Sequence, residues 1–190
     1  PPRAYSPFLE ILNQHFQISA PALRPLWPGS DPGLIKDWHA FREDLLQFLA
    51  GETLGPDIHW PEQLIGTGHS VGATTILMAA IQNPDLFKAL VLIEPVIFPP
   101  LTSRIWRVVS WLGLMETVHP LIKRTLKRKM VFPDRERMFK NYREKTVFKR
   151  IQDSGLRAYV EAMAQDNQQG EVELRYRPAW EARVYATAAL

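Results

Sequence analysis

The sequence predicts an α/β fold in which a mostly parallel sheet is flanked by helices and followed by an all-helical insertion. Three observations predict this class. Short apolar runs alternate with stretches of helical periodicity over residues 1–100. Residues 89–93 are continuously apolar, which is typical of a strand covered on both faces. From Ile105 to about Gln168 only helical periodicity is found.

The first predicted elements are a helix and a short strand. Ser6 and Pro7 precede apolar residues at helical spacing, so we expect Ser6 to be the N-cap and Pro7 to occupy the first helical position. Apolar and polar residues alternate over residues 16–20, which predicts a strand. After a loop rich in Pro and Gly at residues 24–33, Asp37 is expected to cap a packing helix.

A strand, a tight turn and a helix then follow without interruption. Leu64 and Ile65 end a buried strand, residues 68–72 read Gly-His-Ser-Val-Gly, and apolar residues recur at helical spacing to about Gln82. The pattern G-x-S-x-G between a strand and a helix is typical of a nucleophile elbow, a turn that exposes a serine at the edge of a sheet. We therefore expect the chemistry of the protein at this turn.

Ser70 at the apex of the turn is the predicted nucleophile. A serine hydroxyl at its ordinary pKa is a weak nucleophile, so it must be presented to both a base and an electrophile. A sharp turn achieves this with strained backbone angles. We expect Gly68 and Gly72 to avoid collisions that a Cβ would cause, His69 to point away from Ser70, and the N–H of Val71 to face the developing oxyanion.

After the elbow helix the sequence predicts one more strand, at residues 89–93, and then helices alone, the last of them over residues 180–186. The helical block therefore has the position of an insertion into the sheet. The boundaries that we expect are a core over residues 1–100, a helical cap over residues 101–170, and a return segment over residues 171–190.

Composition limits the kinds of site that this sequence can form. The 190 residues are 46% hydrophobic and 23% charged, which are the values of a globular domain. There is no cysteine, and the five histidines show no metal-binding spacing, so we expect neither a metal nor another cofactor. No apolar run reaches the ~18 residues of a membrane span. The lack of cysteine favours a cytoplasmic location.

Charge is distributed unevenly along the chain. Residues 123–150 contain 12 Lys and Arg against three acidic residues, whereas the rest of the chain has 11 basic and 17 acidic residues. Such a segment can bind an anionic partner. Because its basic residues are interleaved with apolar ones, we predict instead that they form the solvated side of amphipathic helices.

These features resemble the cap-bearing members of the α/β-hydrolase superfamily. The resemblance rests on the elbow at residues 68–72 and on the order of the elements around it. It implies that Ser70 is the nucleophile and that the N–H of Val71 is one oxyanion donor. The family also has an H-G-x stretch after its third strand, and a catalytic acid and histidine after later strands. We therefore expect this sequence to be a fragment that lacks both ends of a hydrolase and is inactive on its own.

Glu94 is a possible catalytic acid. It closes the strand at residues 89–93, at the carboxyl edge of the sheet where ligands bind in such folds. A loop carboxylate that caps nearby amides is the alternative. Asp85 is expected at the opposite end of the sheet. Among the histidines, we expect His69 to be structural and His119 to lie on the surface, with a position lining a substrate pocket as the alternative for His119. None is placed as the family's base would be: His15, His39, His59, His69 and His119.

The predicted function is that of a serine hydrolase that cleaves an ester or related acyl bond through an acyl-serine intermediate. Esterase, perhydrolase and carbon–carbon bond hydrolase chemistry remain open. The alternative is a non-catalytic binding or interaction module whose basic cap contacts an anionic partner. We expect a small-molecule substrate with an apolar acyl group and no nucleic-acid partner, and we leave the oligomeric state open. The residues predicted to border an apolar pocket are Trp27, Phe98, Trp106, Trp111 and Met115.

Overall fold

A computed structural model describes residues 1–51 and 63–188. The chain divides into two compact units. The first unit comprises Pro1–Ser30 and Thr125–Glu181, and the second comprises Asp31–Arg124 and Ala182–Leu190. The organisation into core, cap and return segment with boundaries at residues 100 and 170 stays a prediction. His59 lies outside the described residues.

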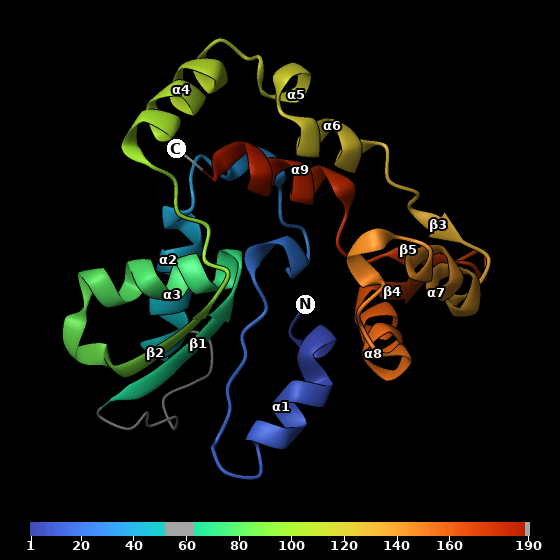
Figure 1. Cartoon of the computed structure of the whole chain (residues 1–190), viewed down its shortest axis with the longest axis horizontal. Coiled ribbons are helices and arrows are strands. Elements are labelled where there is room, and N and C mark those ends of the chain that lie inside the picture. Colours follow the sequence, from blue (N-terminus) through green and yellow to red (C-terminus); the bar gives the residue numbers. More distant parts are fainter. Residues whose placement is uncertain (52–62, 189–190) are drawn as a thin grey trace. The chain divides into compact units, whose positions relative to one another are not determined.

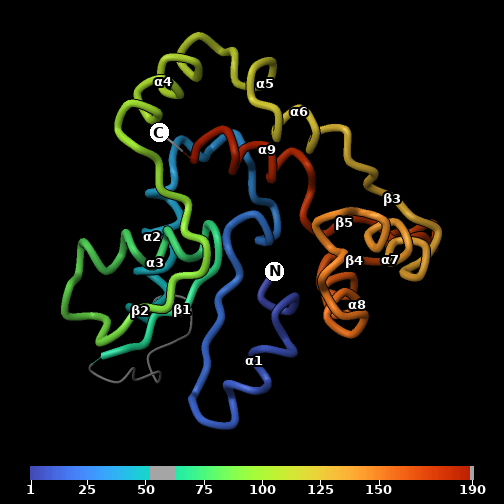
Figure 2. Tube along the Cα trace, viewed as in Figure 1, coloured from blue at the N-terminus to red at the C-terminus, as the bar shows by residue number. Residues whose placement is uncertain are grey.

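The second unit is built around a parallel βαβ unit. Strands β1 (Leu64–His69) and β2 (Phe87–Ile93) pair in parallel, with His69 opposite Ile93. The chain crosses between them through α3 (Val71–Gln82), which packs against both strands (Figure 2). Gly66 of β1 permits this close packing, because a Cβ at this position would lie 2.7 Å from Ile76 Cγ2 of α3. The predicted strand, elbow helix and following strand are therefore confirmed.

Helix α2 (His39–Leu49) packs on α3. The prediction of Asp37 as the cap is one residue off: Trp38 occupies the N-cap position, and the side chain of Asp37, which precedes it, accepts a hydrogen bond from the amide of His39 at 2.8 Å. Trp38 and Phe41 are buried. The indole N–H of Trp38 donates to the carbonyl of Val184 at 3.0 Å, so the second half of α9 is tied to the start of α2.

A small apolar cluster closes the second unit. It is formed by α4 (Pro100–Trp111), α5 (Met115–Val118), the start of α6 (Pro120–Leu126) and the second half of α9 (Pro178–Thr187). Its buried members are Met115, Ile122 and Ala182, with Trp106, Val109, Tyr185 and Ala186 packed against them. The predicted helix near residues 180–186 is thus confirmed as α9.

The first unit combines helices with a small antiparallel sheet. Its strands lie in the order β3 (Val131–Phe132), β5 (Val172–Leu174) and β4 (Ala164–Asp166) (Figure 1). Helices α7 (Arg135–Arg143) and α8 (Asp153–Met163) pack on one another beside it. The core of this unit consists of ten buried residues: Phe132, Met138, Phe139, Tyr142, Leu156, Val160, Met163, Ala164, Val172 and Leu174.

The N-terminal segment also belongs to the first unit. A 3₁₀ turn η1 (Pro2–Tyr5) leads into α1 (Ser6–Leu12), and both contact α8. The prediction of Ser6 as N-cap is wrong. Ser6 already has helical angles, with φ −51° and ψ −43°, because η1 runs directly into α1 and places Tyr5 at the cap position. The described residues contain four further 3₁₀ turns: η2 (Arg24–Leu26), η3 (Pro32–Leu34), η4 (Pro84–Leu86) and η5 (Thr146–Phe148).

Two predicted features of the fold are wrong. Residues 16–20 are not a strand: in the described part of the chain no segment pairs with them, and a strand requires a partner for its amide and carbonyl groups. The insertion is not all-helical, because β3 and β4 interrupt it and pair with β5 in the predicted return segment. In a strand of two or three residues, the alternation of apolar and polar side chains is too short to be distinguished from the periodicity of a helix.

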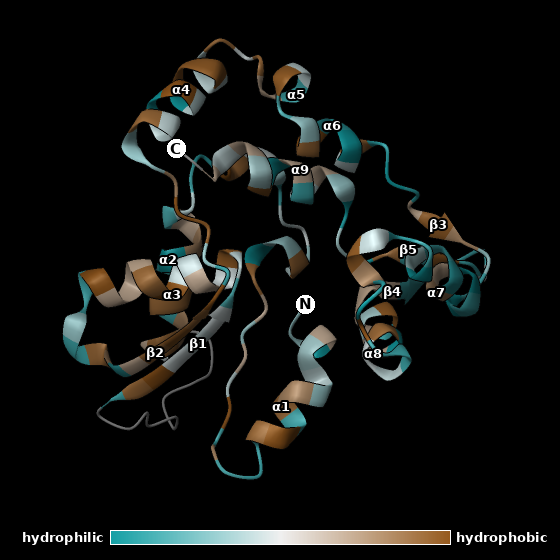
Figure 3. Cartoon of the chain, in the orientation of Figure 1, coloured by the Kyte–Doolittle hydropathy of each residue, from teal (hydrophilic) through white to brown (hydrophobic). Residues whose placement is uncertain are grey.

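The parallel pair is also less covered than its sequence predicts. Strand β2 is hydrophobic over most of its length (Figure 3), but Val91 and Ile93 on one of its faces are 49% and 43% exposed. Helix α3 covers the other face. The described residues therefore leave one apolar face of this sheet open, contrary to the prediction of cover on both faces. No helix in the described ranges is long and apolar enough to cross a membrane.

Candidate active site

The turn between β1 and α3 has the geometry that a nucleophile elbow requires. Ser70, at its apex, has φ 54° and ψ −123°. A non-glycine residue with positive φ is strained, so the surroundings must hold it. The amide of Ser70 donates to the carbonyl of Ile93 at 2.9 Å, which extends the parallel ladder into the turn. The carbonyl of Ser70 accepts a hydrogen bond from the amide of Thr74 at 3.1 Å, and this bond anchors Ser70 to the first turn of α3.

The two glycines that flank the elbow have different roles. A Cβ on Gly68 would lie 2.6 Å from the amide nitrogen of Ala73 and 2.7 Å from its Cα, so the close approach of strand and helix requires glycine there. A Cβ on Gly72 would meet no atom within 4 Å among the described residues. The prediction of a steric role is therefore confirmed for Gly68 and wrong for Gly72.

Val71 is the first residue of α3. The first amides of a helix have no acceptor within it and lie at the positive end of the helix dipole. An oxyanion beside Ser70 would meet these amides. The Val71 N–H as an oxyanion donor stays a prediction, and the start of α3 at this residue is the geometry it needs.

Glu94 is the second strained residue at this edge of the sheet. It follows β2 directly and has φ 47°. In the described residues, Ser70 and Glu94 are the only non-glycine residues with positive φ. Glu94 Oε2 lies 3.6 Å from Nε2 of His69, the residue before Ser70. The side chain of Glu94 is 85% exposed. Sequence reasoning placed both residues at this edge but missed that they form a pair.

Thr74 connects the elbow helix to the segment after β2. Its hydroxyl accepts a hydrogen bond from the amide of Val96 at 2.9 Å and donates to the carbonyl of Val96 at 3.1 Å. Sequence reasoning missed this contact. The only sign of it in the sequence is a pair of threonines, Thr74 and Thr75, inside an otherwise apolar helix.

The family model of the serine aminopeptidases, S33, matches residues 29–172, a range that includes the whole elbow. The chain belongs to this α/β-hydrolase family. A comparison with curated protein sequences gave no match.

Solved structures with the α/β-hydrolase fold are similar to the family member described here. One is E-2-(acetamidomethylene)succinate hydrolase, with a TM-score of 0.65 and 17% identity over 98% of this chain. The chain spans 62% of that protein's length. An α/β-hydrolase from Novosphingobium aromaticivorans has a TM-score of 0.63 and 17% identity, over 94% of this chain and 56% of its own. The thioesterase domain from the curacin biosynthetic pathway has a TM-score of 0.56 and 17% identity, over 97% of this chain and 66% of its own.

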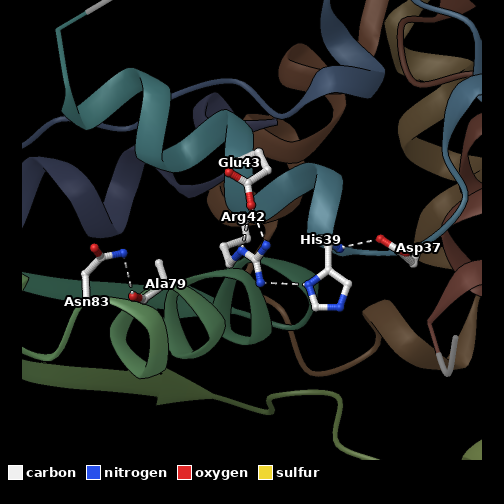
Figure 4. A network of polar contacts seen from close by, with 6 residues as sticks. All are labelled: Asp37, His39, Arg42, Glu43, Ala79 and Asn83. Carbon is white, nitrogen blue, oxygen red and sulfur yellow. Dashed lines mark hydrogen bonds and ion pairs between the residues drawn. The ribbon is translucent and has the colours of Figure 1, made fainter.

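Among the described residues of this α/β-hydrolase chain, none is bonded as a base to Ser70, the predicted nucleophile. The hydroxyl of Ser70 makes no hydrogen bond with any of them. His39 lies in a separate network on α2, where its Nδ1 is 2.8 Å from the guanidinium of Arg42, which also pairs with Glu43 (Figure 4). Asp85 precedes β2 and therefore lies at the opposite end of the strand from Glu94.

His119 is half-buried, with its ring beside those of Trp106 and Tyr185, so it does not lie freely on the surface as predicted. Its ring is 4.9 Å from that of Trp106 and 6.3 Å from that of Tyr185. Its Nδ1 is buried and has no hydrogen-bond partner among the described residues. Burial lowers the pKa of His119, because the charged imidazolium is desolvated there.

The residues predicted to border an apolar pocket have different surroundings. Met115 and Trp106 pack in the cluster of α4 to α6, whereas Trp111 is 84% exposed. Phe98 is half-buried in the segment between β2 and α4. Trp27 belongs to the first unit, where its indole N–H donates to the carbonyl of Ala22 at 2.8 Å. An apolar acyl pocket stays a prediction. In the described ranges no group of three or more metal-binding side chains is placed to hold an ion.

Several of the basic residues in the segment 123–150 have acidic partners within the first unit. Arg135 contacts Glu161 at 3.0 Å and Asp166 at 2.6 Å, and its hydrogen bond lowers the pKa of the Asp166 carboxyl. Arg143 pairs with Asp153, and Arg128 contacts Glu181 at 2.5 Å. These pairs favour the prediction that the segment is a solvated helix surface.

Proposed function

We propose that the protein is a serine hydrolase that cleaves an ester or related acyl bond through an acyl-Ser70 intermediate. The observation that carries this proposal is the strained backbone of Ser70, φ 54°, at the junction of β1 and α3. Such strain costs on the order of 1–3 kcal/mol and persists where function depends on it.

The proposed reaction has two steps. The oxygen of Ser70 attacks the carbonyl carbon of the substrate, its proton passes to a general base, and the amide of Val71 stabilises the oxyanion that forms. The carbonyl re-forms as the leaving group departs with a proton from the base, and water then hydrolyses the acyl-serine in the same manner. We assign the base to a histidine of the full-length protein, since no described histidine is bonded to Ser70. Glu94 is the candidate acid on this chain.

The class of acyl bond follows from the elbow only in broad terms. A serine nucleophile with a helix N-terminus beside it suits carbonyl compounds with a good leaving group, so esters and thioesters are the substrates to test first. A thioesterase domain is among the structures similar to this chain. Perhydrolase and carbon–carbon bond hydrolase activity are the further branches of the same chemistry.

Labelling with a fluorophosphonate tests the proposal in the full-length protein. We expect the probe to label the protein at Ser70 and the Ser70→Ala variant to lose labelling by about 10⁴-fold or more, as removal of a nucleophile does. Ser154→Ala is the matched control, because Ser154 is an exposed serine of α8 in the other unit. Peptide mapping by mass spectrometry identifies the labelled residue.

Two outcomes of this experiment decide between the candidate functions. Labelling that persists in Ser70→Ala contradicts the assignment of the nucleophile. A full-length protein that takes up no label, while binding an anionic partner through the segment 123–150, favours the non-catalytic interaction module. We expect the 190-residue chain alone to be labelled no faster than its Ser70→Ala variant, because its described residues give Ser70 no base.

A further inference from the structure

We propose that Thr74 is a positioning residue, whose side chain holds the turn of Glu94 against the elbow and so keeps the edge of the active site in its reactive geometry. This inference rests on the proposed role of Ser70 as the nucleophile. Thr74 lies in the first turn of α3, four residues after Ser70, which caps this helix.

The contact of Thr74 with Val96 is reciprocal. The Thr74 hydroxyl accepts from the Val96 amide at 2.9 Å and donates towards the Val96 carbonyl at 3.1 Å. One side chain thus satisfies both backbone groups of a residue 22 positions away, as a neighbouring strand would. The segment after β2 has left the parallel ladder at this point, so Thr74 replaces the backbone partner that the sheet no longer provides.

A second contact fixes the other side of the turn. The carbonyl of Ile93 accepts from the amide of Ser70 at 2.9 Å. Glu94 and Pro95 are therefore held between two anchored residues, Ile93 and Val96, and both anchors are bonded to the elbow. The proline ring further restricts the chain, because it fixes the φ angle of Pro95.

The held turn explains how Glu94 keeps a left-handed conformation. Its φ of 47° is unfavourable for a residue with a side chain, and such angles persist only where the surrounding contacts determine them. In this conformation Oε2 of Glu94 lies 3.6 Å from Nε2 of His69, and His69 is the residue that precedes Ser70. If the hydrogen bonds between Thr74 and Val96 are lost, we expect the turn to relax. Both Glu94 and Ile93, whose carbonyl accepts from the amide of Ser70, should then move.

Thr75 provides a matched comparison within the same helix. Its hydroxyl donates to the carbonyl of Val71 at 2.8 Å, one turn earlier in α3, and Thr75 is buried. Replacement of either threonine by valine keeps the shape and removes one hydroxyl. Only the replacement at position 74 removes a contact with the segment after β2.

The test compares Thr74→Val with Thr75→Val and Thr74→Ser in the full-length protein. The first measurement is the inactivation of Ser70 by a fluorophosphonate, resolved into the maximal rate kinact and the half-saturating concentration KI. We expect Thr74→Val to lower kinact about tenfold with KI unchanged, Thr75→Val to resemble the wild type, and Thr74→Ser to restore most of the rate. The second measurement is amide hydrogen exchange of peptides that span residues 94–96, which we expect Thr74→Val alone to accelerate about tenfold.

The outcomes separate this inference from the proposed function. If Thr74→Val exchanges and reacts as the wild type does, or if Thr75→Val shows the same loss, the inference is wrong. If the wild type and Ser70→Ala are labelled alike, the proposed function fails. The exchange measurement then still tests the contact itself: a normal exchange rate at residues 94–96 in Thr74→Val excludes a role of Thr74 in holding the turn of Glu94. Thr74→Ala, with its higher helix propensity, replaces Thr74→Val in both measurements if the valine variant does not fold.

Discussion

The elbow at Ser70 and the core of the first unit are held together in different ways. At the elbow, two non-glycine residues, Ser70 and Glu94, have positive φ, and the parallel strands beside them keep an apolar face open. In the first unit, ten side chains are buried in one cluster, and the positive φ angles are those of Gly29 and Gly170. The elbow therefore depends on backbone contacts, whereas the core depends on side-chain burial.

The difference indicates where this protein is stabilised and where we propose that it reacts. Close-packed apolar side chains form a rigid interior, so their burial suits a scaffold. A reactive serine needs exposure, a fixed direction and a nearby helix N-terminus, and each of these has a cost in free energy. We expect substitutions in the core to change stability and substitutions at the elbow to change reactivity as well.

The largest effect on stability is expected in the core. Leu156 of α8 is fully buried, so Leu156→Ala should lower the free energy of unfolding by about 2–5 kcal/mol, through lost burial and the cavity that remains. Urea unfolding followed by circular dichroism measures the change. Val147→Ala is the control, since Val147 is 75% exposed and should give a change within about 0.5 kcal/mol. Equal losses in both variants contradict the description of this core.

The next effect separates the two glycines of the elbow. Gly68→Ala places a Cβ 2.6 Å from the backbone of Ala73 and should destabilise the protein by about 1–3 kcal/mol, because strand and helix must move apart. Gly72→Ala meets no described atom within 4 Å and should be neutral or stabilising by up to about 1 kcal/mol, since alanine favours the helix. Thermal unfolding of the two variants side by side tests this. A Gly72→Ala variant as unstable as Gly68→Ala would overturn the distinction.

The smallest effect has the opposite sign. Glu94→Gly should stabilise the protein by about 1 kcal/mol, because glycine adopts a φ of 47° without strain. The same variant should react more slowly with a fluorophosphonate, because the carboxylate beside His69 is lost. Unfolding and labelling of one preparation measure both quantities. Glu94→Gln keeps the strain and serves as the control for charge; a Glu94→Gly variant that is less stable than Glu94→Gln contradicts the assignment of strain to this residue.

Local patterns were enough to predict the elements that carry the chemistry. The G-x-S-x-G pattern, the apolar run at residues 89–93 and the periodicity of α3 and α9 are each contained within a short stretch. A glycine at position 68 and a serine at position 70 can be interpreted there because the strand and helix that enforce the turn are its immediate neighbours. The same patterns failed at residues 16–20, where alternation is present but a pairing partner is not, and at β3, β4 and β5, which are too short to show a period.

By itself, then, the sequence determined the resemblance to the α/β-hydrolase superfamily, the serine that we propose as the nucleophile and the βαβ unit around it, because each follows from contacts between residues close together in the chain. Only the tertiary structure decided that Gly68 and not Gly72 is sterically required, that His69 and Glu94 form a pair, and that Thr74 binds Val96. These facts depend on the register between β1 and β2 and on the packing of α3 against them. Register and packing bring together residues some 20 positions apart, and no local pattern of side chains encodes which of them will meet.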